Sequence, residues 1–174
     1  MDVRRLLPIV VVPLLVAALP ADAAPKKSKP NCGGAFTDPR GDAGVFSNSS
    51  LDLTGGDLAL GSREFVAVLR VAGTQTGAPA AVPAEWEYGV SGNGVRYEFT
   101  RRVSTAGVQT SSVHVGGQSV PHKLTVVGGT LVWRFARKSA PALAKPRIVW
   151  HDAAAQTSVA GVPVDNASAA RCSS

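Results

Sequence analysis

Aspartates gather in one short stretch of the sequence, where Asp38, Asp42 and Asp52 follow one another closely. Ca²⁺ binds about six to eight oxygens, drawn from carboxylates, backbone carbonyls and water. The loop between the first two aspartates contains a glycine and can turn its carbonyls and both carboxylates inward. Asp165, far along the chain, completes the ligand set with Asp52 if the first and last strands lie side by side. These four residues are therefore the predicted ligands of a calcium ion that stabilises the fold.

A second interpretation gives the same aspartates a purely local role. Asp38 and Asp42 each stand beside a proline or glycine, and aspartates in such positions often form turns by hydrogen bonding to their own backbone. Asp57, which follows two glycines, fits a bulge in the same way. Calcium binding and turn formation both remain open from the sequence.

The sequence carries no recognisable catalytic motif. The patterns G-x-S-x-G and H-E-x-x-H are absent, and His114, His122 and His151 lack the spacing of a zinc site. Glu85 and Glu87 flank a tryptophan in a strand pattern, where glutamates commonly do no more than face water. We therefore expect a chain without enzymatic activity.

The first segment has the features of a secretory signal peptide. Arg4 and Arg5 precede an apolar run from Leu6 to Leu19, and Ala21-Asp22-Ala23 supplies the small residues at a cleavage site. A membrane-spanning helix needs roughly 20 apolar residues, and this run is shorter and contains two prolines. We expect residues 1–23 to be removed and the protein to be secreted to the extracellular space, without a transmembrane segment.

The remainder is expected to form one domain, residues 32–174, behind a disordered, lysine-rich linker at residues 24–31. The formal net charge of +6 favours anionic partners, but the basic residues are dispersed and form no nucleic-acid motif. Cys32 and Cys172 stand at the two ends of this domain, and an even cysteine count in an exported protein predicts a disulfide between them. We expect a monomer.

Apolar and polar residues alternate along most of the domain, as in strands with one buried and one wet face. Asn93-Gly94 and Gly128-Gly129 are typical of tight hairpin turns. The predicted fold class is therefore all-β, an antiparallel β-sandwich of the jelly-roll or immunoglobulin-like kind with about eight strands. The expected strands are 51–60, 64–72, 85–90, 95–103, 108–115, 122–127, 130–137 and 147–154.

Several of these motifs together resemble secreted bacterial β-sandwich modules of the DOMON and family-9 carbohydrate-binding type. Such modules begin with an F-x-D-P-x-G-D-A pattern and often end in D-x-A near the last strand. The matching residues here are Asp38-Pro39, Gly41-Asp42, Asp52-Leu53, Asp57-Leu58 and Asp165-Asn166-Ala167. The resemblance implies a β-sandwich that binds carbohydrate.

Sugar-binding sandwiches stack pyranose rings on exposed aromatic side chains, but most rings of this chain alternate in phase with the predicted core. Trp150, beside His151 and Asp152, is the least clearly patterned and is the predicted ligand-binding residue. The function expected from the sequence is a secreted, non-enzymatic binding module for carbohydrate or cell-envelope polymer, with a structural calcium site. A structural or protein-interaction domain and a hydrolase with an unrecognised site remain alternatives.

Overall fold

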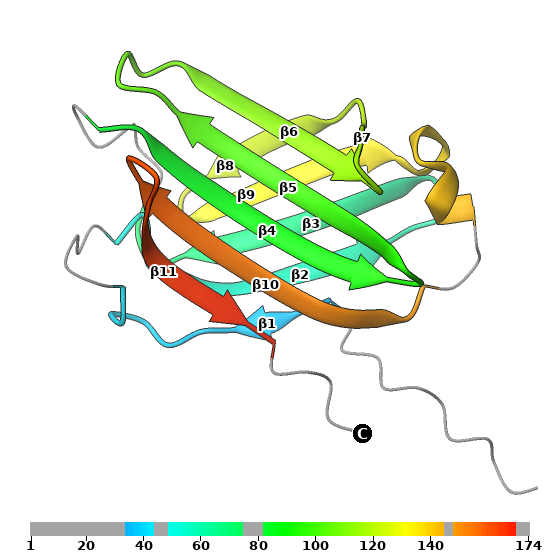
Figure 1. The fold of residues 1–174 in the computed structure, drawn as a ribbon, viewed down its shortest axis with the longest axis horizontal. Coiled ribbons are helices and arrows are strands. Elements are labelled where there is room, and N and C mark those ends of the chain that lie inside the picture. The colour runs from blue at the N-terminus through cyan, green and yellow to red at the C-terminus, as the bar shows by residue number, and fades with distance from the viewer. Residues whose placement is uncertain (1–33, 44–48, 75–81, 145–147, 170–174) are drawn as a thin grey trace, which may run out of the picture.

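The computed structural model describes residues 34–43, 49–74, 82–144 and 148–169. Within them, two antiparallel sheets pack face to face as a β-sandwich (Figure 1). The five-stranded sheet has the order β1 (Phe36–Thr37), β2 (Leu53–Leu60), β3 (Glu64–Val71), β9 (Thr130–Ala136) and β8 (Lys123–Val127). The six-stranded sheet has the order β11 (Val162–Ser168), β10 (Trp150–Val159), β4 (Ala84–Gly92), β5 (Val95–Val103), β6 (Gln109–Val115) and β7 (Gln118–Ser119).

The predicted all-β sandwich is confirmed, with eleven strands in the described residues instead of about eight. Each of the eight expected strands corresponds to an observed one. Two short 3₁₀ helices, η1 (Arg137–Ser139) and η2 (Pro141–Ala144), follow β9. No helix in the described residues is both long and apolar enough to cross a membrane.

The added strands are the short β1 and β7 and the seven-residue β11. β11 was not predicted because Pro163 stands second in it, and proline removes a ladder hydrogen bond. β11 tolerates this residue because it is the edge strand of its sheet. The turn before β11 is Ala160-Gly161. Ala160 has a φ of 51°, and alanine rarely adopts this conformation, so the sequence did not indicate a turn here.

Aromatic rings from both sheets fill the centre of the sandwich. Phe65 of β3 lies with its ring centroid 5.8 Å from Tyr97, 5.9 Å from Phe99 and 5.0 Å from Phe135. All four rings are buried. Such pairs contribute about 0.5–1.5 kcal/mol each beyond the area that they bury, and they join the two sheets into one core.

One end of the core is polar. A row of inward-facing residues crosses the six-stranded sheet in register, from Asp165 through Thr157, Trp86 and Arg101 to Ser111. The Thr157 hydroxyl donates to the carbonyl of residue 51 over 2.6 Å, and the Trp86 indole donates to the carbonyl of residue 50 over 2.8 Å. The segment that leads into β2 is thereby held against this row.

Candidate cation site and binding face

The predicted calcium ligands come from three separate segments. Asp38 and Asp42 lie in the loop after β1, Asp52 directly precedes β2, and Asp165 lies in β11. β1 pairs with β2, and β11 contacts both strands. The first and last strands therefore lie side by side, as the calcium prediction required.

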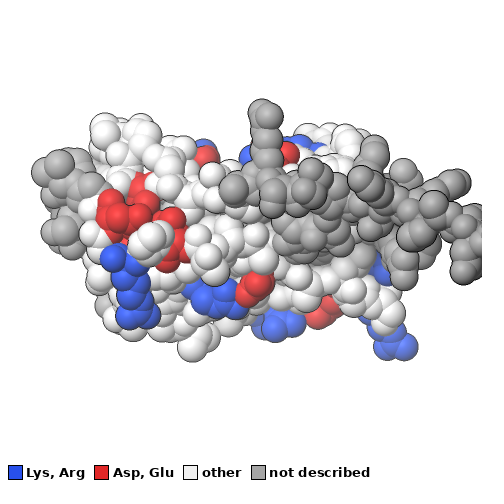
Figure 2. Space-filling view, turned by 90° about the horizontal axis from the view of Figure 1, so that it is seen from below, with Lys and Arg blue, Asp and Glu red and all other residues white. Residues whose placement is uncertain are grey.

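The carboxylates of Asp38, Asp42 and Asp165 converge. One oxygen from each lies within 4.8 Å of the others. Asp52 and Asp165 are each only 6% exposed, Asp38 is half-buried and Asp42 is exposed. Figure 2 shows acidic side chains gathered at one end of this side of the molecule. Three carboxylates from two segments of the chain therefore meet at one place, with Asp165 buried and Asp42 exposed.

Backbone amides fix two of these carboxylates. The amide of Gly41 donates to Asp52 Oδ2 over 2.8 Å, and the amide of Leu53 donates to Asp165 Oδ2 over 2.7 Å. The other oxygen of Asp52 and the Oδ2 of Asp38 are buried and have no hydrogen-bond partner within the described structure. Two oxygens are therefore desolvated and without a partner, but only Asp38 belongs to the converging set; Asp52, the fourth predicted ligand, does not.

The cluster holds like charges at close quarters. Burial, and after it the neighbouring carboxylates of Asp165, Asp42 and Asp52, together raise the pKa of Asp38 from 3.8 to about 6. Burial likewise raises the pKa of Asp165, against the opposing effect of the Leu53 amide. A bound cation would relieve both effects, because it neutralises the charge that burial disfavours.

Asp57 takes no part in this cluster. Its carboxylate forms an ion pair with Arg70, the residue diagonally across the β2–β3 ladder, and both side chains are about half exposed. Asp57 therefore has its own counter-charge and serves as a natural control for the cluster.

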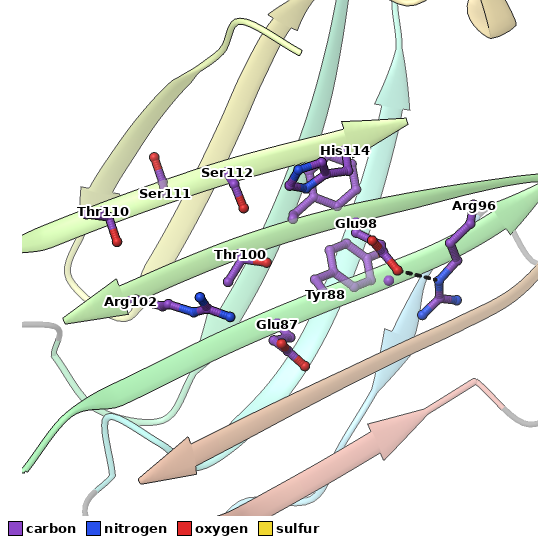
Figure 3. A pocket seen from close by; sticks show the side chains of 12 residues that line it. Glu87, Tyr88, Arg96, Glu98, Thr100, Arg102, Thr110, Ser111, Ser112 and His114 are labelled. Carbon is purple, nitrogen blue, oxygen red and sulfur yellow. Dashed lines mark ion pairs between the residues drawn. The ribbon is translucent and has the colours of Figure 1, made fainter. Parts of the chain in front are cut away.

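A second candidate site is a shallow groove of about 450 Å³ on the outer face of the six-stranded sheet (Figure 3). Outward side chains of β4, β5 and β6 line it in cross-strand rows. The middle row runs from Glu87 through Thr100 to Ser112, and the next from Gly89 through Glu98 to His114. The lining thus combines carboxylates, hydroxyls and an imidazole on one rigid sheet.

The middle row, from Glu87 to Ser112, continues beyond the groove. Gln156 of β10 pairs with Glu87, and Asn166 of β11 pairs with Gln156. Five polar side chains therefore stand in register across five strands, and a second hollow of about 240 Å³ extends the groove toward β11. Neighbouring strands lie about 4.8 Å apart, so this polar row is roughly 19 Å long.

Gly89 makes room for the Arg96 side chain where the two hollows of this face meet. A Cβ at this position would lie 2.0 Å from Nη2 of Arg96, whose side chain crosses the glycine. Arg96 is held by an ion pair with Glu98 at 3.7 Å and by one with Asp152 at 3.3 Å. The guanidinium is thus kept at the groove even though it is exposed.

Glu85 and Glu87 lie on the same outward face of β4. Arg102 donates to Glu85 over 2.6 Å. Burial raises the pKa of Glu87, and the nearby Glu85 raises it further. Glu87 therefore holds its proton more tightly than a free glutamate does.

The expectation that Trp150 is exposed is wrong. Its side chain is 6% exposed, and its ring lies edge-on to Tyr97 at 5.1 Å and to Phe65 at 5.9 Å. The β10–β4 ladder has a bulge at this point, with Trp150 opposite Gly92 and Asp152 opposite Ser91. The bulge interrupts the alternation of inward and outward residues at the start of β10, and it turns the Trp150 ring toward the core.

Every aromatic side chain in the described part of the chain is buried. The three histidines do not converge: His114 lies in the groove, His151 is exposed on β10, and His122 contacts the Ser111 hydroxyl at 2.8 Å. Within the described residues, the three converging aspartates are the only group of three or more acidic, histidine or cysteine side chains placed to share one ion.

Sequence reasoning did not find the groove. Outward polar positions on a sheet look alike in a sequence, because any wet face is polar. One signal was present: Gly89 interrupts a strand pattern, and a strand-interior glycine often marks a close approach. The predicted signal peptide, the linker, Cys32 and Cys172 lie outside the described residues.

The two candidate sites occupy different parts of the sandwich, one at the contact of β1, β2 and β11 and one on the open face of β4 to β6. Neither depends on a catalytic motif. No family model matches this chain, and no curated protein and no solved structure matches it either.

Proposed function

We propose that this protein is a secreted, non-enzymatic binding module that holds an extended polar polymer, a carbohydrate or a cell-envelope glycan, on the outer face of its six-stranded sheet. The observation that carries the proposal is the polar row from Asn166 to Ser112. The resemblance of the opening motif to secreted carbohydrate-binding modules supports the same assignment.

The chemistry of the row suits a chain of hydroxyl groups. Glu87 offers acceptors, Thr100 and Ser112 offer hydroxyls, and the amides of Gln156 and Asn166 offer both donors and acceptors. Recognition would proceed through hydrogen bonds along the row, because the aromatic rings of the described residues lie in the core. A sheet positions these groups more rigidly than loops would, which limits the entropy lost on binding.

Retention on insoluble polymers tests this function. The wild-type protein should sediment with at least one of cellulose, chitin or purified bacterial cell wall. Thr100→Lys puts a long charged side chain into the row, between Glu87 and Ser112, and should abolish retention. The matched control is Thr125→Lys, which makes the same change on β8 of the other sheet and should leave retention intact. Equal retention of both variants, or no retention of the wild type, would refute the binding face.

We further propose that calcium braces this module at the contact of its first and last strands. The supporting observation is the convergence of the three carboxylates of Asp38, Asp42 and Asp165. Asp52 is only 6% exposed, with one carboxylate oxygen engaged by Gly41 and the other without a partner in the described structure. Asp38, Asp42, Asp52 and Asp165 would hold the ion. Calcium would neutralise their charge and link the loop after β1 to β11.

Thermal unfolding with calcium and with chelator tests the brace. An ion at a hundredfold its Kd stabilises the folded state by about 2.7 kcal/mol, which raises the melting temperature of a domain of this size by several degrees. Asp165→Asn should abolish the shift, whereas Asp57→Asn, outside the cluster, should preserve it. A melting temperature that does not respond to calcium would reduce these aspartates to turn and capping residues.

A further inference from the structure

A pocket of about 500 Å³ opens on the side of the sandwich where β6 of one sheet lies near β8 of the other. This side is opposite the cation site, at the other end of the inward polar row that begins with Asp165. The residues that line the pocket are Arg101, Gln109, Thr110, Ser111, Leu124 and Val126.

Arg101 supplies the charge in this pocket. It stands on the inward face of β5 and is 1% exposed, and its guanidinium carbon lies 4.5 Å from the centre of the Trp86 ring. Nη2 donates to Oε1 of Gln109 over 3.1 Å. Burial lowers the pKa of Arg101, yet an arginine stays protonated at physiological pH. A stacked, buried cation therefore lines the pocket.

The rest of the lining is apolar on one side and hydroxylic on the other. Leu124 and Val126 of β8 are half-buried and pack against the core. Thr110 and Ser111 stand on β6. Gln109, the residue that accepts from Arg101, is itself exposed at the start of β6, so its side chain can swing away into water.

We propose that this pocket binds a small aliphatic carboxylate, whose carboxylate group replaces the Gln109 amide oxygen at Arg101 and whose carbon chain lies along Leu124 and Val126. A guanidinium matches a carboxylate in shape and forms charge-assisted hydrogen bonds that are about twice as strong as neutral ones. The exchange of a neutral acceptor for a charged one at a site shielded from water therefore favours the ligand.

The lining also discriminates between ligands of the same length. An alkyl ammonium ion would meet a like charge at Arg101. An alkyl alcohol fits the aliphatic side chains but offers only a neutral acceptor, no better than the Gln109 amide that it would displace. The negative charge and the carbon chain of the ligand are therefore both needed for binding.

This site meets the edge of the polymer-binding face, because Thr110 and Ser111 line both hollows, but its charged group is a different one. Arg101 points into the sandwich, whereas its neighbour Arg102 points outward and pairs with Glu85. The polymer test changes Thr100, which lines only the groove, and the carboxylate test changes Arg101 or Gln109, which line only this pocket, so the two proposals can fail separately.

Titration of the folded protein with hexanoate, followed by NMR at the Arg101 Nε–H and the Trp86 indole N–H, tests the proposal. Hexanoate should shift both resonances saturably, and hexanol and hexylammonium should not. Arg101→Gln should weaken hexanoate binding at least about tenfold, because it removes the charge-assisted bonds. Arg102→Gln, one residue away on the opposite face, should bind like the wild type.

A second variant keeps the test decisive if Arg101→Gln fails to fold. Gln109→Glu is nearly isosteric, lies at an exposed position and places a carboxylate of the protein where the ligand's should sit. It should raise the melting temperature and weaken hexanoate binding about tenfold or more, whereas Gln118→Glu on β7 should do neither. The proposal is overturned if millimolar hexanoate leaves both wild-type resonances unshifted, or if Gln109→Glu binds hexanoate as well as the wild type does.

Discussion

At the scale of single residues, the cation site is the place where burial and charge conflict most directly. Asp38 has two carboxylates as close neighbours and a third, Asp52, behind them, and the pKa of Asp38 is raised to about 6. Arg40 of the same loop is exposed, and Arg70 of β3 is engaged by Asp57. The cluster therefore destabilises the folded protein at neutral pH unless a cation joins it.

The sign of this effect predicts a pH dependence. The pKa of Asp38 is about 6 in the folded protein and close to 3.8 in the unfolded chain, so the folded state binds the proton more tightly. Without calcium, the contribution of Asp38 to stability is therefore greatest below about pH 4 and is lost as the pH rises through 6. Asp38→Asn should remove this component and raise the stability at pH 7 by about 1–2 kcal/mol.

Thermal unfolding of the wild type and of Asp38→Asn in chelator, from pH 4.5 to 7.5, measures this component. The difference between the two melting temperatures should grow as the pH rises. Saturating calcium should reverse the order at pH 7, because the wild type alone keeps the full ligand set. Parallel pH profiles for the two proteins would show that Asp38 titrates normally.

At the scale of elements, the β10–β11 hairpin carries both a ligand of the cation site and one end of the polar row. Its turn places Ala160 at φ 51° and Gly161 at φ 79°. A left-handed conformation costs a residue with a Cβ about 1–2 kcal/mol, so the turn is held against the preference of its alanine. β10 pairs with β4 on one side and with β11 on the other, and this pairing stabilises the turn in its unfavourable conformation.

Two substitutions in this turn should have opposite effects on stability. Ala160→Gly should raise the free energy of unfolding by about 0.5–1 kcal/mol, because glycine adopts positive φ without the steric cost. Gly161→Ala should lower it by about 1 kcal/mol or more, although a Cβ there meets no atom within 4 Å. Urea denaturation of both variants measures the pair. A loss of stability in Ala160→Gly would contradict the strained turn.

At the scale of the whole molecule, the sandwich brings its two ends together. β1 and β11 are in contact although they stand at opposite ends of the domain. Cys32 lies four residues before β1, and Cys172 lies four residues after β11. An extended chain spans at most about 3.6 Å per residue, so four residues can cover up to about 14 Å. A bond between them would close nearly the whole domain into one loop.

We predict that this disulfide forms and stabilises the domain by about 4–5 kcal/mol on the chain-entropy model. Intact-mass measurement with and without a reductant should show a difference of two hydrogens in the purified protein. Reduction should lower the melting temperature of the wild type, whereas the double variant Cys32→Ser/Cys172→Ser should be insensitive to reductant. Two free thiols in the unreduced protein would refute the pairing.

Local patterns in the sequence determined the strands and most of the turns of this protein. Alternation of the kind seen from Val95 to Val103 depends only on neighbouring side chains pointing to opposite faces, so it can be read without knowledge of the partner strand. Asn93-Gly94 likewise specifies its own turn, with both residues at positive φ. The carboxylates that meet in the structure were also found, because aspartates are few and their motif is distinctive.

Only the tertiary structure decided which side chains share a surface. The burial of Trp150 follows from a bulge in the β10–β4 ladder, and a bulge is a property of two strands together. The alternation placed Arg101 on the inward face of β5, but the Trp86 ring beneath it and the β8 side chains beside it come from other segments. The same holds for the polar row, whose register exists only once five strands have paired. Burial and register are set by contacts between distant segments, and these contacts form only when the chain folds.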